Sequence, residues 1–187
     1  NSLKARMRAD DLSALRDEYA HVHKFLDGEL GGIGLSPIST GSNVDAKVAI
    51  VMQDFAGAET LEVVQSDPEL REYAIATGRK KGLQSNKNLD TILESMGMTT
   101  ADVYMTNAML FVKQGTMSAP IKAVDVAYSV DNYVAEELEI VDPEVVLCLG
   151  GAAFDSLRKH YGAKGGVDSF EANGRRYIKL PHPSPLS

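Results

Sequence analysis

The stretch KVAIVMQDFAG, residues 47–57, indicates the fold of this chain more clearly than any other. Its first part, Lys47 to Met52, is a short run rich in β-branched and other apolar residues, which is typical of a strand buried on both faces. Gln53 and Asp54 follow at once and lead into small residues, so we expect the strand to end there in a turn. A buried strand with polar residues directly after it is the pattern of a parallel sheet with a ligand site at one edge.

Further apolar runs have the same character, and helical patterns separate them. We predict additional strands at 103–107, 144–149 and 175–180, and helices at 10–28, 67–77, 86–97, 121–140 and 152–161. Strands that alternate with helices form parallel β-α-β units, with helices on both faces of the sheet. The predicted fold class is therefore α/β, a three-layer α/β/α sandwich around a four-stranded parallel sheet. We expect one domain over 1–187, with an N-terminal helix and loop at 1–45 and the α/β core at 46–187.

Composition narrows the class of protein. The chain has 187 residues, of which 44% are hydrophobic and 24% charged, which suits one globular domain. Its single cysteine, Cys148, lies in an apolar run, so a cysteine-ligated zinc site or four-cysteine cluster within this chain is excluded and a reducing compartment fits. No apolar run approaches the roughly 20 residues of a membrane helix, and the first residues do not resemble a secretory signal. We expect a cytoplasmic, monomeric protein with no membrane partner.

The net charge of the chain is −7. An acidic protein is not a strong non-specific binder of nucleic acid, because such affinity comes mainly from Lys and Arg on phosphates. Local basic clusters remain, among them Arg79-Lys80-Lys81, so one face of the protein can still be basic. Charge alone leaves both a nucleic-acid partner and a small-molecule partner open.

Three polar side chains follow the predicted strands at the edge where ligands bind in parallel sheets. Asp54 comes after the first strand, Asn107 ends the second and His182 follows the fourth. Taken singly, Asp54 is a turn former or helix cap and Asn107 ties down a loop. His182, however, stands in the run Pro181-His-Pro-Ser-Pro185, whose fixed backbone suits a side chain that must be held in place.

Several catalytic patterns are missing. No pair of histidines has the spacing of a zinc hydrolase, and the chain lacks both the phosphate-binding loop of nucleotide triphosphatases and the Gly-x-Ser-x-Gly elbow of α/β-hydrolases. The pair Gly150-Gly151 after the third strand has two interpretations. It can cradle a phosphate at a helix N-terminus, or it can simply let strand and helix pack closely.

Together these segments resemble the uracil-DNA glycosylase superfamily. The resemblance rests on Gln53-Asp54, on Thr106-Asn107-Ala-Met-Leu110 and above all on the closing hexapeptide His-Pro-Ser-Pro-Leu-Ser at 182–187. It extends over residues 46–187. Three motifs in the right order at the ends of successive strands are far more specific than any one of them.

The resemblance implies catalytic roles for Asp54 and His182. Such enzymes flip a nucleotide out of the DNA helix, because the bond between base and sugar cannot be reached inside a duplex. Asp54 would stabilise the positive charge that develops on the sugar and would orient or deprotonate the attacking water. His182 would donate a hydrogen bond to the departing base. Asn107 would read the edge of the base, with help from Gln53 and with Phe55 as the candidate stacking ring.

The same resemblance implies contacts with DNA. Residues 183–186 would touch the DNA, with Ser184 and Pro185, next to Pro183, against the backbone and Leu186 as an apolar wedge in the vacated stack. The partner would be single- or double-stranded DNA containing uracil or a damaged base. Neither a metal ion nor an organic cofactor is implied.

One motif departs from the family pattern. The best-known branch has Gly-Gln-Asp-Pro-Tyr-His at the first motif, where this chain has Met52-Gln53-Asp54-Phe55-Ala56-Gly57. The aspartate is kept, but the tyrosine that blocks the methyl group of thymine is replaced by Ala56. We therefore hypothesise a broader pocket, which admits 5-substituted pyrimidines or another damaged base. Two alternatives stay open: a weakly active or inactive base-binding module of the same fold, and a hydrolase of free nucleosides or nucleotides.

Overall fold

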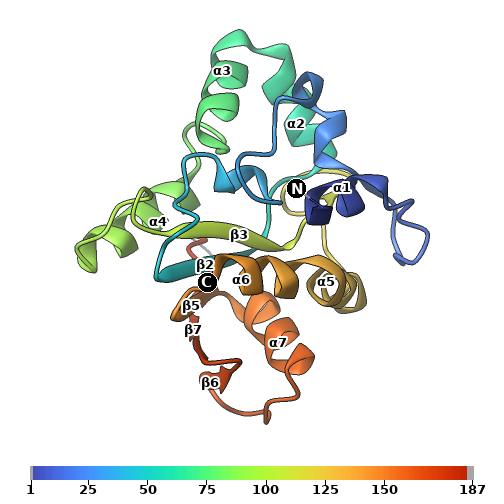
Figure 1. Ribbon diagram of the computed structural model, residues 1–187. Coiled ribbons are helices and arrows are strands. Elements are labelled where there is room, and N and C mark those ends of the chain that lie inside the picture. The colour runs from blue at the N-terminus through green and yellow to red at the C-terminus, as the bar shows by residue number, and fades with distance from the viewer. Residues whose placement is uncertain (1, 185–187) are drawn as a thin grey trace.

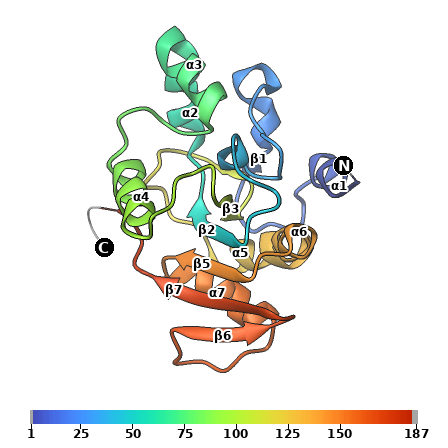
Figure 2. The same ribbon diagram turned by 60° about the vertical axis from the view of Figure 1, so that its left-hand side comes forward.

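A five-stranded mixed sheet organises the computed structural model, which describes residues 2–184. The strand order is β3-β2-β5-β7-β6, and the bounds are Tyr104–Met109 for β3, Val48–Asp54 for β2, Val145–Leu149 for β5, Arg175–Leu180 for β7 and Ser169–Ala172 for β6. The pairs β3–β2, β2–β5 and β5–β7 are parallel, whereas β6 runs antiparallel to β7 at the edge of the sheet (Figure 2).

The sheet therefore differs from the predicted one, which had four strands, all parallel. The four predicted strands are present within two residues of their expected bounds, and β6 is the additional one. The hairpin between β6 and β7 turns on Asn173 and Gly174, both of which have positive φ. An Asn-Gly pair between two short strands is a strong hairpin signal, and the prediction overlooked it.

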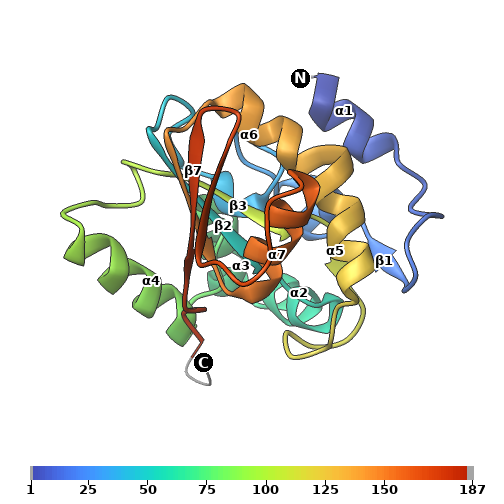
Figure 3. The same cartoon turned by 90° about the horizontal axis from the view of Figure 1, so that it is seen from below.

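Helices cover both faces of the sheet. On one face α4 (Gln84–Ser95) packs Leu89 and Leu93 against β2, β3 and β5. The other face is covered by a continuous helical stretch made of α5 (Ala123–Ser129), the π-helical η4 (Val130–Val134) and α6 (Ala135–Val141), together with α7 (Gly151–His160). Figure 3 shows α4 on one side of the sheet and α5, α6 and α7 on the other. These helices and α3 (Pro68–Thr77) lie within two residues of their predicted bounds, while α2 (Ala58–Ser66) was not predicted.

The predicted helix at 10–28 is wrong. The structure has α1 at Ser2–Ala9, a short strand β1 at Tyr19–Ala20, and the 3-10 turns η1 (Val22–Lys24) and η2 (Leu26–Gly28). Leu12 and Leu26 adopt positive φ, which interrupts any helix there. The strand β1 pairs antiparallel with β4 (Val112–Lys113). Its backbone groups therefore form hydrogen bonds to another strand and not the i to i−4 bonds of a helix.

The apolar spacing that suggested a helix at 10–28 has another origin. Val22 and Leu26 are buried in a core cluster with α2 and β4, each from its own turn. A further 3-10 turn, η3 (Pro37–Ser39), lies against β3. The N-terminal segment thus wraps the sheet near the carboxyl end of β2 (Figure 1). No helix within residues 2–184 is long and apolar enough to cross a membrane.

Candidate active site

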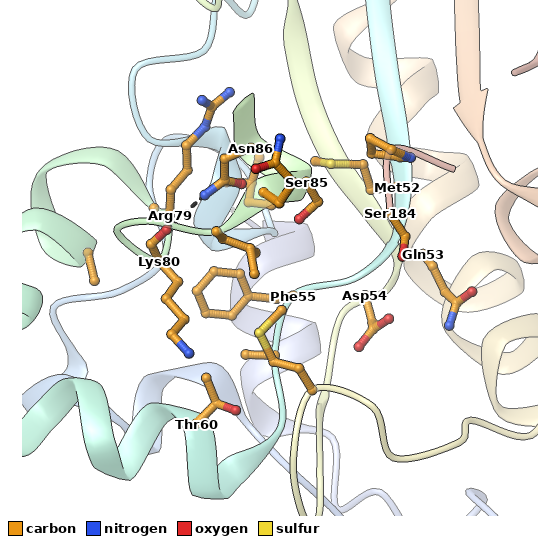
Figure 4. Close-up of a pocket in the computed structure, with 18 of the residues that line it drawn as sticks. Met52, Gln53, Asp54, Phe55, Thr60, Arg79, Lys80, Ser85, Asn86 and Ser184 are labelled. Carbon is orange, nitrogen blue, oxygen red and sulfur yellow. Dashed lines mark hydrogen bonds between the residues drawn. The ribbon is translucent and has the colours of Figure 1, made fainter. Parts of the chain in front are cut away.

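A cavity of about 390 Å³ opens at the carboxyl ends of β2 and β7. Its size is within the range of small-ligand pockets. Its walls come from the end of β2, from α2 and α3, from the loop between α3 and α4, and from the C-terminal segment; they include Met52, Asp54, Phe55, Leu61, Lys80 and His182. Figure 4 shows these walls converging around Asp54 and Phe55. Six of the predicted site residues therefore share one cavity: Gln53, Asp54, Phe55, His182, Pro183 and Ser184.

Asp54 is the last residue of β2, and its carboxylate is held by a lysine. The Oδ2 atom of Asp54 lies 2.8 Å from Nζ of Lys113, and both side chains are largely buried. Lys113 also donates a hydrogen bond of 2.6 Å to the carbonyl of Met117, which is another residue of the cavity wall. An ion pair in such surroundings is screened far less than one at the surface. The carboxylate is thereby directed by a fixed cation.

His182 follows β7 after Pro181, and a backbone hydrogen bond fixes its ring. The backbone N–H of Ser184 donates to Nδ1 of His182 at 3.1 Å, so the neutral imidazole carries its proton on Nε2. Burial lowers the pKa of His182, while the Asp54 carboxylate acts in the opposite direction. A neutral ring with a proton on Nε2 is a hydrogen-bond donor, which is the form needed to stabilise an anion.

The imidazole of His182 packs against Gly150, where the absence of a side chain leaves room for it. A Cβ atom at Gly150 would stand 3.2 Å from Cδ2 and 3.3 Å from Cβ of His182, and the residue has a φ of 99°. A side chain at position 150 would meet both backbone strain and the imidazole. The close contact of Gly150 is with His182, which differs from the strand–helix packing considered for the glycine pair.

The C-terminal segment is anchored by α4. Asn88 of α4 donates a hydrogen bond of 2.8 Å from Nδ2 to the carbonyl of Pro183. Pro183 and Ser184 both line the cavity. Pro185 and Leu186, which were predicted to contact DNA, lie outside the described residues.

The first motif lines the cavity with residues of different character. Phe55 is half-buried between two apolar clusters, and Figure 4 shows its ring between Lys80 and Asp54. Ala56 is a small, buried part of the wall. The side chain of Gln53 lies on the side of Asp54 away from Phe55 (Figure 4). Phe55 is thus placed to stack on a ring in the cavity, whereas the Gln53 side chain is not directed toward Phe55.

Asn107 is not brought into the cavity. It lies inside β3 rather than at its end, it is fully buried, and its Nδ2 donates to Oγ of Ser36 at 2.5 Å. Its Oδ1 atom has no hydrogen-bond partner among residues 2–184. The prediction missed this because the segment before η3, which the sequence indicated only as a loop, packs over the amide.

Sequence reasoning missed Lys113 and undervalued Lys80. A signal for Lys113 exists, since a lysine that closes the apolar run Ala108–Val112 must find a partner when it is buried. Lys80, which was interpreted as part of a surface cluster, lines the cavity, makes no ion pair within residues 2–184 and points toward Thr60 in Figure 4. Its neighbours Arg79 and Lys81 are paired with Asp90 and Glu69.

The site combines two groups of complementary chemistry. An ionised carboxylate can stabilise a developing cation or direct a water molecule, and a neutral imidazole can donate a hydrogen bond to a developing anion. Such a pair suits cleavage of a bond that leaves positive charge on one fragment and negative charge on the other. Within residues 2–184, no group of three or more His, Cys, Asp or Glu side chains is placed to hold a metal ion.

A family model matches most of the chain. The family model described as UDG, Uracil DNA glycosylase superfamily, matches residues 52–187, nearly three quarters of the chain. The matched region begins in β2 and includes Asp54, Lys113 and His182. A search of curated proteins finds no match.

Proposed function

The chain belongs to the uracil DNA glycosylase superfamily, and from that premise we propose that it hydrolyses the N-glycosidic bond of uracil, or of a related damaged base, in DNA. The observation that carries the proposal is the shared cavity of Asp54 and His182 at the carboxyl ends of β2 and β7. The family assignment supports a hydrolytic DNA glycosylase in general terms. The substrate and the residue roles are our inference from the site.

We assign the two charge-stabilising roles to Asp54 and His182. When the bond between base and sugar breaks, the sugar gains positive charge, and the Asp54 carboxylate stabilises it and orients the attacking water. The departing base gains negative charge, and Nε2–H of His182 donates to its oxygen. The depressed pKa of His182 supports this role, because the ring stays neutral and keeps a single donor at neutral pH.

We assign stacking on the base to Phe55, whereas Asn107 lies outside the cavity lining. The ring of Phe55 stacks on the flipped base, consistent with its place beside Asp54 in the cavity wall. For Asn107 the observations conflict. Its buried, unpaired Oδ1 atom supports a role as acceptor, because leaving such an atom unpaired costs about 1–3 kcal/mol. Its hydrogen bond to Ser36 counts against that role, so reading of a base by Asn107 requires Ser36 to release the amide.

We propose that the pocket accepts pyrimidines with a substituent at C5. The wall beyond Asp54 is formed by Ala56 and by the apolar side chains of Leu61, Val64 and Ala74, and the cavity of about 390 Å³ has room beyond a single ring. A panel of oligonucleotides with uracil, thymine or 5-hydroxymethyluracil opposite guanine tests this breadth. Excision of uracil alone would contradict it.

Lys80 favours DNA over a free nucleoside as the substrate. Its ammonium is at the cavity wall, makes no ion pair within the described chain, and can pair with a phosphate next to the flipped nucleotide. The net charge of −7 favours the second candidate, a hydrolase or binding module for free nucleosides. Comparing 2′-deoxyuridine with a uracil-containing oligonucleotide, each at low and high salt, separates the two candidates, because only DNA binding weakens steeply with salt.

The decisive experiment measures excision from labelled oligonucleotides that carry one uracil, single-stranded or opposite guanine or adenine. Wild type is compared with Asp54→Asn and His182→Ala. The matched controls are Asp155→Asn and His160→Ala, whose side chains contact Arg158 and Asp131 and are not part of the cavity. Abasic sites from wild type and both controls, with a loss of about 10²-fold or more in the two site variants, support the proposal. Activity equal to that of wild type in Asp54→Asn and His182→Ala contradicts the assigned roles.

A further inference from the structure

The roles assigned to Asp54 and His182 do not explain why a lysine, Lys113, is buried next to Asp54. It is a buried lysine in β4, and its ammonium contacts two groups, the Asp54 carboxylate at 2.8 Å and the carbonyl of Met117 at 2.6 Å. Burying an ammonium is costly unless it is paired and hydrogen-bonded. A core position that only needed filling would take an apolar side chain at lower cost, so the charge itself calls for an explanation.

The backbone around Lys113 is fixed on both sides. Lys113 pairs with Tyr19 of β1 and forms an isolated bridge with Gly57, just before α2. The loop that follows is pressed against α2, because a Cβ at Gly57 would stand 2.2 Å from the carbonyl oxygen of Gly115. The N–H of Glu59 donates to that same oxygen at 3.1 Å. The ammonium is therefore presented to Asp54 from a rigid support.

We propose that Lys113 is the positioning residue for Asp54: it orients the carboxylate toward the cavity and keeps it ionised when bound DNA excludes water. This inference rests on the proposed glycosylase function. It assigns to the glycosidic reaction a third side chain, which acts through Asp54 and does not touch the base. Because Lys113 is not part of the cavity wall, the substrate meets the carboxylate rather than the ammonium.

The electrostatics of the site support this assignment. A carboxylate that loses its water takes up a proton unless a cation stays beside it. Two further titratable groups whose charges interact with Asp54 are His182 and Tyr19. Burial keeps His182 neutral by lowering its pKa, and burial with the nearby Asp125 keeps Tyr19 neutral by raising its pKa. Within residues 2–184, Lys113 is the cation in an ion pair with Asp54.

The same geometry argues against Lys113 as a nucleophile. An amine attacks the sugar carbon only with its lone pair, and an ammonium in an ion pair has none. Lys113 is also only 4% exposed. Treatment of the reacting enzyme with borohydride, which traps a covalent imine between lysine and sugar, therefore captures no protein on the DNA.

The test is a double-mutant cycle on single-turnover excision. It compares wild type, Lys113→Gln, Asp54→Asn and the double variant. Lys122→Gln serves as the control, because Lys122 forms an exposed ion pair with Asp17. We expect Lys113→Gln to lose on the order of 10²-fold in rate in the wild-type background, as for a misplaced catalytic group. In the Asp54→Asn background the same change should cost less than about threefold, because a residue acting through Asp54 has nothing left to position.

Two further readouts separate positioning from a merely structural role. The acidic limb of the pH–rate profile should move up by about one to two pH units in Lys113→Gln, and Lys113→Arg, which keeps the charge, should recover most of the rate. A loss of equal size in both backgrounds, an unmoved acidic limb or a trapped covalent complex each overturns the proposal. Thermal unfolding of every variant identifies those that fail to fold, and if Lys113→Gln is among them, Lys113→Met takes its place in the cycle.

Failure of the glycosylase proposal can be distinguished from failure of the proposal for Lys113. If wild type leaves every base of the panel intact, the glycosylase proposal fails. The positioning of Asp54 is then tested without activity, by following the side-chain carboxyl carbon of Asp54 by NMR as a function of pH. Its titration should occur at higher pH in Lys113→Gln than in wild type, and identical curves overturn the inference.

Discussion

Two carboxyl groups of this protein have different surroundings, the partly buried Asp54 at the end of β2 and the buried Glu137 on α6. Glu137 accepts hydrogen bonds from Tyr104 Oη at 2.6 Å, Thr106 Oγ1 at 2.7 Å and the backbone N–H of Leu35 at 2.8 Å. A smaller cavity of about 130 Å³ borders Glu137, but both of its carboxyl oxygens already have partners. Asp54 instead has a charged partner and lines the larger cavity.

The difference shows how surroundings separate a structural carboxyl group from a functional one. A polar group satisfied by neutral donors inside the protein ties elements together, here α6, β3 and the loop before η3. Burial raises the pKa of Glu137, although its hydrogen bonds act in the opposite direction. A carboxylate that is paired with a cation and directed into a cavity is typical of catalytic sites. Substitutions at the two groups test whether Asp54 serves mainly activity and Glu137 mainly stability.

The largest effect is expected for Asp54→Asn. The amide keeps a hydrogen bond from Lys113 but loses the negative charge, so the excision rate should fall by roughly 10³-fold. The unfolding free energy should fall by up to about 3 kcal/mol, because Lys113 keeps a hydrogen bond but its buried ammonium loses its charged partner. Single-turnover excision and urea unfolding of the same preparation measure the two quantities. If Asp54→Asn is strongly destabilised but excises at the wild-type rate when folded, Asp54 has a structural role and the contrast with Glu137 is lost.

Glu137→Ala should have the opposite profile. It removes three hydrogen bonds, leaves the N–H of Leu35 without its partner and creates a hole, so we expect a loss of about 2–4 kcal/mol in unfolding free energy. The excision rate of the folded fraction should stay within about twofold of wild type. Urea unfolding followed by circular dichroism checks the first expectation, and active-site titration before the rate measurement checks the second. Loss of rate with unchanged stability would place Glu137 in the reaction.

Glu137→Gln should have a smaller, pH-dependent effect. The folded pKa of Glu137 lies above the ordinary value of 4.5, so its favourable contribution is complete below that value and is lost as pH rises through the folded pKa. Glutamine does not titrate. The variant should therefore gain stability relative to wild type as the pH rises above 4.5, as measured by unfolding free energies at several pH values. A difference that does not vary with pH would show that the carboxyl group does not titrate in this range.

Tyr104→Phe should have the smallest effect of the four. It removes one donor to Oε1 of Glu137, while the N–H of Leu35 still donates to that atom, so we expect a loss of about 1 kcal/mol. Thermal unfolding against wild type detects a change of this size. A loss as large as that of Glu137→Ala would mean that the network acts as one unit rather than as separate bonds.

Much of the core was predictable from local pattern. The runs around Ile50, Met105 and Leu147 are apolar on both faces and short, which identifies buried strands, and the helices at 68–77 and 84–95 have clear apolar faces or end signals. The positions of Asp54 and His182 at one edge follow from parallel topology alone. The family resemblance, which the match over 52–187 confirms, rests on the same segments.

The N-terminal segment was predicted poorly because its structure depends on distant partners. The spacing of Leu12, Tyr19, Val22 and Leu26 is helical, but Tyr19 pairs with Lys113 and Leu26 adopts a positive φ. Spacing reports which side chains are buried, not the element against which they pack. This segment lies before the matched region, yet Ser36 bonds to Asn107 and Ile38 lines the cavity.

By itself, the sequence determined the order of strands and helices in the core and the edge of the sheet at which polar groups gather, because hydrophobic periodicity and strand-end chemistry are local properties. Only the tertiary structure decided which of those groups share a cavity. It buried Asn107 beneath Ser36, seated His182 against Gly150 and set Lys113 beside Asp54. Each of these contacts joins residues far apart in the chain, and their energies depend on distance and burial, which become defined only when the chain has packed.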